Sequence, residues 1–299
     1  MSIGQNDAPH NWYVVFDQAV RDAGFVRSRF DPCLYHTREN GKLTGVLGAH
    51  VDDTATGGTG ASHNKALAFL KQRFPYRKWR IGNGDFCGSM YNQCPKTFEI
   101  TVSQSTYAES LKPISMSRTR QNQKEAAATD GEVATLRAVN GAVNWLAGQS
   151  RPDLSVQVSK SQQCFPRPTV QDLHNANLMI RRARQHADCE VTFRYIPPDK
   201  LTTCTHTDAA YANATEHKTQ AGNLIGFTNV KLNGGFEANW TPACWRSNRL
   251  PRVVNSTLSG EAQAFSTASG TVEWIMLLIA EAIDGPFDLR TVNEVLTRR

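Results

Sequence analysis

An Asn-Gly turn between two β-type segments is the feature that most narrows how this chain can fold. Residues 31–37 and 43–51 are rich in strand-forming side chains, and a turn at 39–41 (Glu-Asn-Gly) separates them. Asn and Gly adopt the left-handed backbone of a tight turn at low cost, so this pattern predicts an antiparallel hairpin. The second segment of the hairpin runs directly into Asp52 and Asp53.

Helical and β-type segments alternate along the 299 residues, which predicts an α+β fold. Helical spacing of apolar residues occurs in segments 11–24, 61–74, 132–149, 152–164, 169–186 and 259–283. β-type runs cover 81–102, expected to be a tightly turned hairpin, and 201–206, 220–227 and 235–240. Residues 54–60 are expected to be a flexible Gly-rich turn, and residues 116–130 a mobile polar loop. The prolines at 197–198 predict a domain junction near 197–200.

Composition and apolar run length exclude several classes of protein. The longest apolar run, residues 274–283, is about half the length that a membrane span needs. The N-terminal residues have neither a basic start nor an apolar segment, so an intracellular protein is expected. Seven cysteines at irregular spacing, without a C-x-x-C pair, predict reduced thiols rather than disulfides or a zinc site. The net charge of +6 is a mild bias toward a polyanionic partner.

Two pairs of acidic residues are candidates for metal-dependent chemistry. Asp52 and Asp53 are adjacent carboxylates, which repel one another unless a cation lies between them, as in two-metal phosphoryl-transfer sites. From the dipeptide alone, an acidic β-turn is the favoured interpretation, because Asp is common in turns. Asp208 follows a predicted strand and Glu261 begins a predicted helix, so both could reach one divalent cation. A first-turn acid favoured by the helix dipole is the structural alternative for Glu261.

Basic and aromatic residues interleave between Lys71 and Arg80 without an acidic residue. The cations of this stretch are Lys71, Arg73, Arg77, Lys78 and Arg80. Cations neutralise phosphates and aromatic rings stack on bases, so the stretch is a candidate nucleic-acid contact. A solvated basic turn with its aromatic rings packed beneath it remains the alternative. His206 and His217 lack a third zinc ligand at suitable spacing, and the glycines at 57–60 lack the Lys-Ser/Thr of a phosphate loop.

These segments together resemble the pol region of copia-type long-terminal-repeat retrotransposons, in which the later part of reverse transcriptase is followed by RNase H. Seven collinear motifs carry the resemblance over nearly the whole chain. In the polymerase part, residues 7–13 resemble Gln-Ala-Pro-Arg-x-Trp-Tyr, residues 24–34 resemble Gly-Phe…Asp-Pro-Cys-Leu, and residues 50–53 resemble the Tyr-Val-Asp-Asp box. Farther along, residues 86–88 resemble Phe-Leu-Gly and residues 150–154 resemble Thr-Arg-Pro-Asp-Ile. In the RNase H part, residues 207–212 resemble Ser-Asp-Ala-Asp-Trp-Ala and residues 259–263 resemble Ser-Thr-Glu-Ala-Glu.

The resemblance implies three regions and two metal sites. Residues 1–110 would be the C-terminal part of a reverse-transcriptase palm, 111–197 a helical thumb and connection, and 198–299 a truncated RNase H-like α/β domain. The implied catalytic and metal-binding residues are Asp52, Asp53, Asp208 and Glu261, with Mg²⁺ or Mn²⁺ as cofactor. The implied partners are an RNA template, a DNA primer and an RNA–DNA hybrid, without a membrane, in a cytoplasmic particle or the nucleus.

Departures from the family pattern lower the expected activity. His50 replaces the tyrosine of the box, which the resemblance places near the primer end. The first palm aspartate of the family lies upstream of the Ala-Pro segment, and its third RNase H aspartate has no counterpart in residues 291–299. The isolated chain is therefore expected to have little or no catalysis of either kind. The alternatives are a non-catalytic nucleic-acid-binding remnant and a weak metal-dependent nuclease in the C-terminal half.

Overall fold

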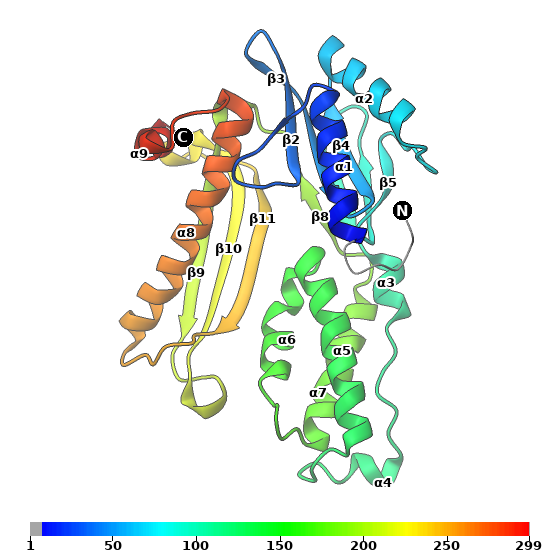
Figure 1. Ribbon diagram of the computed structural model, residues 1–299. Helices are drawn as coiled ribbons and strands as arrows, with labels where there is room; N and C mark the ends of the chain where they lie inside the picture. The colour runs from blue at the N-terminus through cyan, green and yellow to red at the C-terminus, as the bar shows by residue number, and fades with distance from the viewer. Residues whose placement is uncertain (1–7, 299) are drawn as a thin grey trace. The chain divides into compact units, whose positions relative to one another are not determined.

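The computed structural model describes residues 8–298, and Figure 1 labels its helices and strands. The described residues divide into two compact units. One unit holds the described residues up to Ile81 together with those from Glu273 onward, and the other holds Gly82–Val272. Every strand pairing in the described range is antiparallel, and helices accompany the sheets, so the expected α+β class is confirmed. The division at 110 and 197 into palm, thumb and RNase H regions stays a prediction.

The first unit contains a four-stranded meander in the order β1-β2-β3-β4. Its strands are β1 (Val26–Arg27), β2 (Leu34–Glu39), β3 (Lys42–His50) and β4 (Asp53–Gly58). The predicted β2–β3 hairpin is confirmed, and its turn residues Asn40 and Gly41 have φ values of 50° and 77°. Both residues therefore take the left-handed conformation for which the Asn-Gly pair is suited.

The expectation of a flexible turn over residues 54–60 is wrong. Residues 53–58 form β4 and pair with β3 along its length, from His50↔Asp53 to Gly45↔Gly58. Strand propensity depends on context, and pairing with a central strand outweighs the weak preference of a Thr-Ala-Thr-Gly-Gly segment. The consequence for the acidic pair is that a two-residue connection, Val51 and Asp52, joins the two strands.

Two amphipathic helices form the core of this unit with the sheet. They are α1 (Ala8–Asp22) and α2 (Ala61–Arg73), which confirm the helices predicted over 11–24 and 61–74. Asp7, the first residue of the motif at 7–13, lies outside the described residues. The buried side chains of this core come from both helices and the strands: Phe16, Ala19, Val20, Phe25, Tyr35, Leu47, Ala66, Leu70 and Phe74.

The ring of His63 packs directly against the backbone of the β3–β4 pair. A Cβ atom at Gly45 would overlap this ring, and one at Gly58 would overlap the ring and the backbone of Thr44 and Gly45. His63 is 2% exposed and meets the ring of Phe25 edge to face. The two glycines therefore let α2 approach the sheet closely.

The C-terminal half of helix α8 (Thr257–Asp284) also belongs to the first unit. Glu281 is 2% exposed there and accepts hydrogen bonds from Ser28 Oγ at 2.6 Å and from Arg29 N and Nε at 3.0 and 2.8 Å. Arg38 donates to the last carbonyl oxygens of the helix, those of Glu281, Ala282 and Ile283. These contacts satisfy carbonyl groups that a helix end leaves unpaired. The short helices η5 (Leu289–Thr291) and α9 (Val292–Arg298) follow.

The second unit begins with another antiparallel sheet in the order β5-β6-β7-β8. The strands are β5 (Asn83–Phe86), β6 (Ser89–Gln93), β7 (Ile100–Ser103) and β8 (Glu190–Phe193). The hairpin predicted within residues 81–102 is confirmed by β5 and β6. Strand β8 was not predicted, and it pairs with β7 from a distant part of the sequence.

Helices packed around one apolar core form the middle of this unit. They are α3 (Ser105–Ser110), α4 (Arg118–Gln121), α5 (Asp130–Gln149), η1 (Pro152–Leu154), α6 (Ser155–Gln162) and α7 (Val170–Gln185). The helices predicted over 132–149, 152–164 and 169–186 are thus confirmed. Leu136, Leu146, Leu154 and Leu173 are fully buried in this core. Thr129 and Glu132 form a capping box that starts α5.

The expectation of a mobile loop over residues 116–130 is not matched by the local structure. The segment contains α4, and Arg120 binds Glu132 at 2.7 Å and the carbonyl oxygen of Ala127 at 2.7 Å. This ion pair lowers the pKa of Glu132 to about 2, although burial opposes the shift. The polar composition of this segment predicted disorder. The hydrogen bonds and the ion pair of Arg120 nevertheless order it, a role that buried apolar side chains have in the core of this unit.

The last sheet consists of three long strands in the order β11-β10-β9. They are β9 (Leu201–Ala210), β10 (Gln220–Asn229) and β11 (Trp240–Arg249). The strand predicted over 235–240 is wrong in position, because β11 only begins at Trp240. Helix α8, predicted over 259–283, follows this sheet, and its Ala264 packs in a small cluster with Ala209, Ala221 and Leu250.

Candidate functional site

Asp52 and Asp53 lie at the tip of the β3–β4 hairpin. Asp53 is the first residue of β4 and pairs across the turn with His50, the last residue of β3. All three side chains are exposed. The tight connection forces Val51 to a φ of 54°, which is unusual for a β-branched residue and costs on the order of 1–3 kcal/mol. A strained, exposed turn thus presents two neighbouring carboxylates to solvent.

Trp12 holds this strained turn against the core of the first unit. Its Nε1 donates to the carbonyl oxygen of Val51 at 2.8 Å. The indole ring in turn meets Phe74 edge to face, with centroids 5.4 Å apart. The turn therefore does not depend on its own two residues for its shape, and the aromatic contact links it to the end of α2.

Glu261 reaches the strand that carries Asp208. Its Oε1 accepts a hydrogen bond from the backbone N of Ala209 at 3.2 Å. Asp208 lies within β9 rather than after it, opposite Gly222 of β10, and its side chain is exposed. The structure thus brings the two predicted residues onto neighbouring elements, with Glu261 bound to the residue next to Asp208.

Alternation along β9 aims the Asp208 side chain away from α8. Ala209 packs against Ala264 of α8, and successive side chains of a strand point to opposite faces. Asp208 therefore shares a face with Gln220, whose Nε2 donates to Ser159 Oγ of α6 at 2.9 Å. Glu261 meets the strand from the opposite face.

The described residues do not complete a metal site at either acidic pair. Carboxylate oxygens are suitable ligands for Mg²⁺. However, nowhere in residues 8–298 do three or more His, Cys, Asp or Glu side chains gather so that they could hold a metal ion. In the same range, no helix is long and apolar enough to cross a membrane.

The basic stretch Lys71–Arg80 presents its cations and packs most of its rings. The side chains of Lys71, Arg73, Arg77, Lys78 and Arg80 are all exposed. Phe74 belongs to the core of the first unit, with Tyr76 packed against it. The Lys71 Nζ lies 3.9 Å from the centroid of the Trp79 ring, which Tyr76 contacts edge to face. This arrangement matches the alternative of a solvated basic turn with its aromatic rings packed beneath it, and a nucleic-acid contact by the cations stays a prediction.

Sequence reasoning missed a cavity lined by arginines in the first unit. Arg21, Arg27 and Arg29 come from the end of α1, from β1 and from the loop after it. The sequence signal was only the pair of arginines flanking Ser28. Nothing in the spacing showed that Arg21 lies beside them.

Comparison with known proteins finds similarity to two retrotransposon Pol polyproteins. No protein-family model matches the chain. The chain is 23% identical over 290 residues to the retrovirus-related Pol polyprotein from transposon RE2 of Arabidopsis thaliana. It is 22% identical over 288 residues to that of transposon RE1 from the same plant. Each similarity covers 93% of this chain and 19% of the relative, so the chain spans about a fifth of the length of these curated relatives. The resemblance to copia-type Pol polyproteins that the motifs indicate is confirmed.

Proposed function

We propose that this chain is a retrotransposon-derived Pol segment that binds nucleic acid and carries parts of a reverse-transcriptase and an RNase H site. The observation that carries the proposal is similarity over 93% of the chain to two Pol polyproteins, with the acidic motifs on ordered elements. The parent function would be RNA-directed DNA synthesis coupled to removal of the RNA strand.

The β3–β4 hairpin supports the polymerase part of the proposal. Asp52 and Asp53 occupy an exposed turn that Trp12 orients, with His50 beside them. Two-metal phosphoryl transfer requires carboxylates at a fixed place that a primer end can reach. An exposed hairpin tip anchored to a buried core meets both requirements.

The order of elements in the C-terminal region supports the RNase H part. Three antiparallel strands are followed by a helix, and the acidic residues lie on β9 and near the start of α8. Mg²⁺ or Mn²⁺ is part of the proposal, and the bound ion would activate a water or a primer hydroxyl. Asp52 and Asp53 would hold an ion at the first site through carboxylate oxygens. Asp208 and Glu261 approach β9 from opposite faces, so they would share an ion at the second site only after one of the two side chains is re-oriented.

The isolated chain is proposed to have little or no catalysis of either kind. Within the described residues each acidic pair lacks the further ligands that would gather into a metal site. Loss of one carboxylate from a shared cluster weakens metal binding and misplaces the nucleophile. Binding of template, primer and RNA–DNA hybrid through exposed cations does not depend on those ligands.

A paired activity assay tests this proposal. Primer extension on an RNA template and cleavage of an RNA–DNA hybrid are measured with Mg²⁺ and with Mn²⁺, beside Asp52→Asn and Glu261→Gln. We expect background rates in both assays and measurable hybrid binding. Extension abolished by Asp52→Asn, or cleavage abolished by Glu261→Gln, would show that other groups complete a site and would contradict the inactive assignment.

A non-catalytic nucleic-acid-binding remnant is the second candidate function. The exposed cations of Lys71–Arg80 favour it, since they need no metal. Hybrid affinity that is unchanged when EDTA removes divalent ions supports this candidate. Affinity that falls on chelation, and is restored by Mg²⁺, would instead place a metal ion in the binding site.

A further inference from the structure

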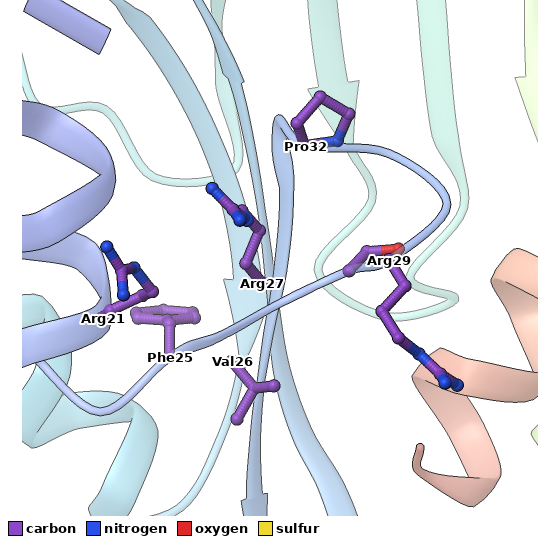
Figure 2. Close-up of a pocket in the computed structure, with 7 residues that line it drawn as sticks. Arg21, Phe25, Val26, Arg27, Arg29 and Pro32 are labelled. Carbon is purple, nitrogen blue, oxygen red and sulfur yellow. The ribbon is translucent and has the colours of Figure 1, made fainter. Parts of the chain in front are cut away.

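A cavity of about 610 Å³ opens at the edge strand of the first unit. Arg21, Arg27 and Arg29 line it together with Phe25, Val26, Ser28 and Pro32. Figure 2 shows Arg21 and Arg27 on the same side of the Phe25 ring, while Arg29 turns toward α8. The volume lies in the range of sites that bind small ligands or parts of larger ones.

Buried carboxylates lie beneath the exposed guanidinium groups. Asp17, 4% exposed, binds Arg21 at 2.9 Å and Arg27 at 3.2 Å. Glu281, 2% exposed, binds Arg29 at 2.8 Å. The arginine side chains are 46%, 44% and 38% exposed. An approaching anion therefore meets the cations first, and the acids that orient them stay below the surface.

The shared acid pre-organises Arg21 and Arg27. Tyr35 donates to Asp17 Oδ1 at 3.0 Å, and Arg21 Nε donates to Oδ2 at 3.0 Å, so the carboxylate itself is fixed. A guanidinium has five N–H donors, and after the bonds to Asp17, Gln18 and Tyr13 each of the two arginines keeps donors available. Ligand binding usually costs conformational entropy because flexible side chains become ordered. Arg21 and Arg27 are already ordered by Asp17, so a ligand here loses less free energy to that process.

The chemistry of these donors points to phosphate. Guanidinium forks bind phosphate oxygens through two parallel hydrogen bonds, and this geometry favours arginine over lysine. We propose that this cavity binds one phosphodiester of a nucleic-acid strand through Arg21 and Arg27. The inference rests on the proposed nucleic-acid binding, and it adds a contact separate from Lys71–Arg80.

A charge placed on β1 beside the cavity, without disturbing Asp17, gives the first test. Val26 lines the cavity, is 49% exposed and takes part in none of the ion pairs described above. Val26→Glu and Val26→Gln differ by one charge at nearly equal volume. Fluorescence anisotropy with a labelled RNA–DNA hybrid is expected to show affinity about fivefold weaker for Val26→Glu than for Val26→Gln in low salt. The difference should shrink as salt rises.

The salt dependence of Arg27→Gln gives the second test. Removing one phosphate contact lowers the slope of log affinity against log salt by about one. Arg27→Gln is expected to show this change, whereas Arg290→Gln should keep the native slope. Arg290 is in the same unit, has a 90% exposed side chain and pairs only with Asp288 among the ion pairs. Circular dichroism melts check that Arg27→Gln is folded.

The outcomes separate this inference from the proposed function. A native chain that binds no nucleic acid would overturn both. Hybrid binding with equal affinities for Val26→Glu and Val26→Gln would overturn the cavity assignment alone. Calorimetry with pyrophosphate adds a third arm, since a site for free phosphates would bind it tightly in Val26→Gln and weakly in Val26→Glu. Suppose that pyrophosphate binds Val26→Gln tightly and Val26→Glu weakly, while both variants bind the hybrid equally well. This result would also contradict the proposal that the cavity binds a phosphodiester of a nucleic-acid strand.

Discussion

Two buried histidines in the first unit make its stability depend on pH. His36 and His63 are each 2% exposed. Burial lowers the pKa of both below the ordinary value of 6.5; for His36, Arg38 adds to the lowering and Glu281 opposes it. Both imidazoles therefore take up a proton at a lower pH in the folded state than in the unfolded chain, which binds protons below about pH 6.5. Stability is fully present above that pH and is lost as the pH falls.

Urea unfolding between pH 7.5 and 5.5 checks this prediction. Each histidine is expected to contribute up to about 1.4 kcal/mol of lost stability per pH unit below its unfolded pKa. His63→Gln removes one titrating group, so its pH dependence should be shallower than that of the native chain. An equal slope for the two proteins would show that His63 titrates alike in the folded and unfolded states.

The strained turn residue Val51 predicts a stabilising substitution. At a φ of 54°, Asn or Gly fits the backbone better than a β-branched side chain. Val51 is 65% exposed, so little packing is lost. Val51→Asn is therefore expected to raise the free energy of unfolding by about 1 kcal/mol. Thermal melts of both variants check this, with Val46→Asn in β3 as the control that is expected to be destabilised. A lower melting temperature for Val51→Asn than for the native chain would contradict the strain argument.

At the scale of elements, the contacts of Glu281 fasten the end of α8 to the first unit. Burial opposes its ionisation, but hydrogen bonds from Arg29 and Ser28 leave the pKa of Glu281 below its ordinary value. The stability from this group is present above the unfolded pKa of about 4.3 and is lost as the pH falls through the lower folded pKa.

Glu281→Gln tests this attachment. The substitution removes a charge from a buried hydrogen-bonded cluster and is expected to cost about 2 kcal/mol of unfolding free energy. Glu273→Gln, on the same helix but exposed, is expected to change it by less than about 0.5 kcal/mol. Hydrogen exchange of the last turns of α8 should accelerate only in Glu281→Gln. Equal exchange in both variants would show that other contacts hold the helix end.

Elements with their own local signals could be predicted from the sequence, and elements that depend on distant partners could not. The Asn40-Gly41 hairpin and the long amphipathic helices need only neighbouring residues. Strand β4 contains Thr, Ala and Gly and exists because β3 lies beside it. The four residues of β8 likewise pair with β7, almost ninety positions earlier. Propensity carries no information about such partners.

The candidate sites divide in the same way. Asp52 and Asp53 could be located because two carboxylates follow a strand, and Glu261 because it follows a helix start. The placement of Asp208 inside β9, on the face away from α8, required the register of the sheet. The arginine cavity required the ion pair that joins Asp17 of α1 to Arg27 of β1, which no spacing in the sequence reports.

At the scale of the whole chain, the net charge of +6 predicts salt-sensitive binding. Affinity for an RNA–DNA hybrid is expected to fall steeply between 50 and 200 mM salt, because phosphate contacts release counterions. Replacing both Arg77 and Lys78 with Gln should lower the salt slope by about two. Replacing Lys200 and Lys231, two exposed lysines elsewhere, should leave it unchanged. Identical slopes for the two double variants would rule out a specific role for Lys71–Arg80.

The contact of the His63 ring with Gly45 and Gly58 restricts which residues related sequences can carry at positions 45, 58 and 63. Gly45 is excluded from carrying a side chain chiefly by the His63 ring, whereas Gly58 also faces backbone atoms of Thr44 and Gly45. A related sequence with a small residue at position 63 is therefore free to carry alanine at 45, but not at 58. Positions 45 and 63 should vary as a correlated pair among relatives, while glycine persists at 58 whatever its neighbours become.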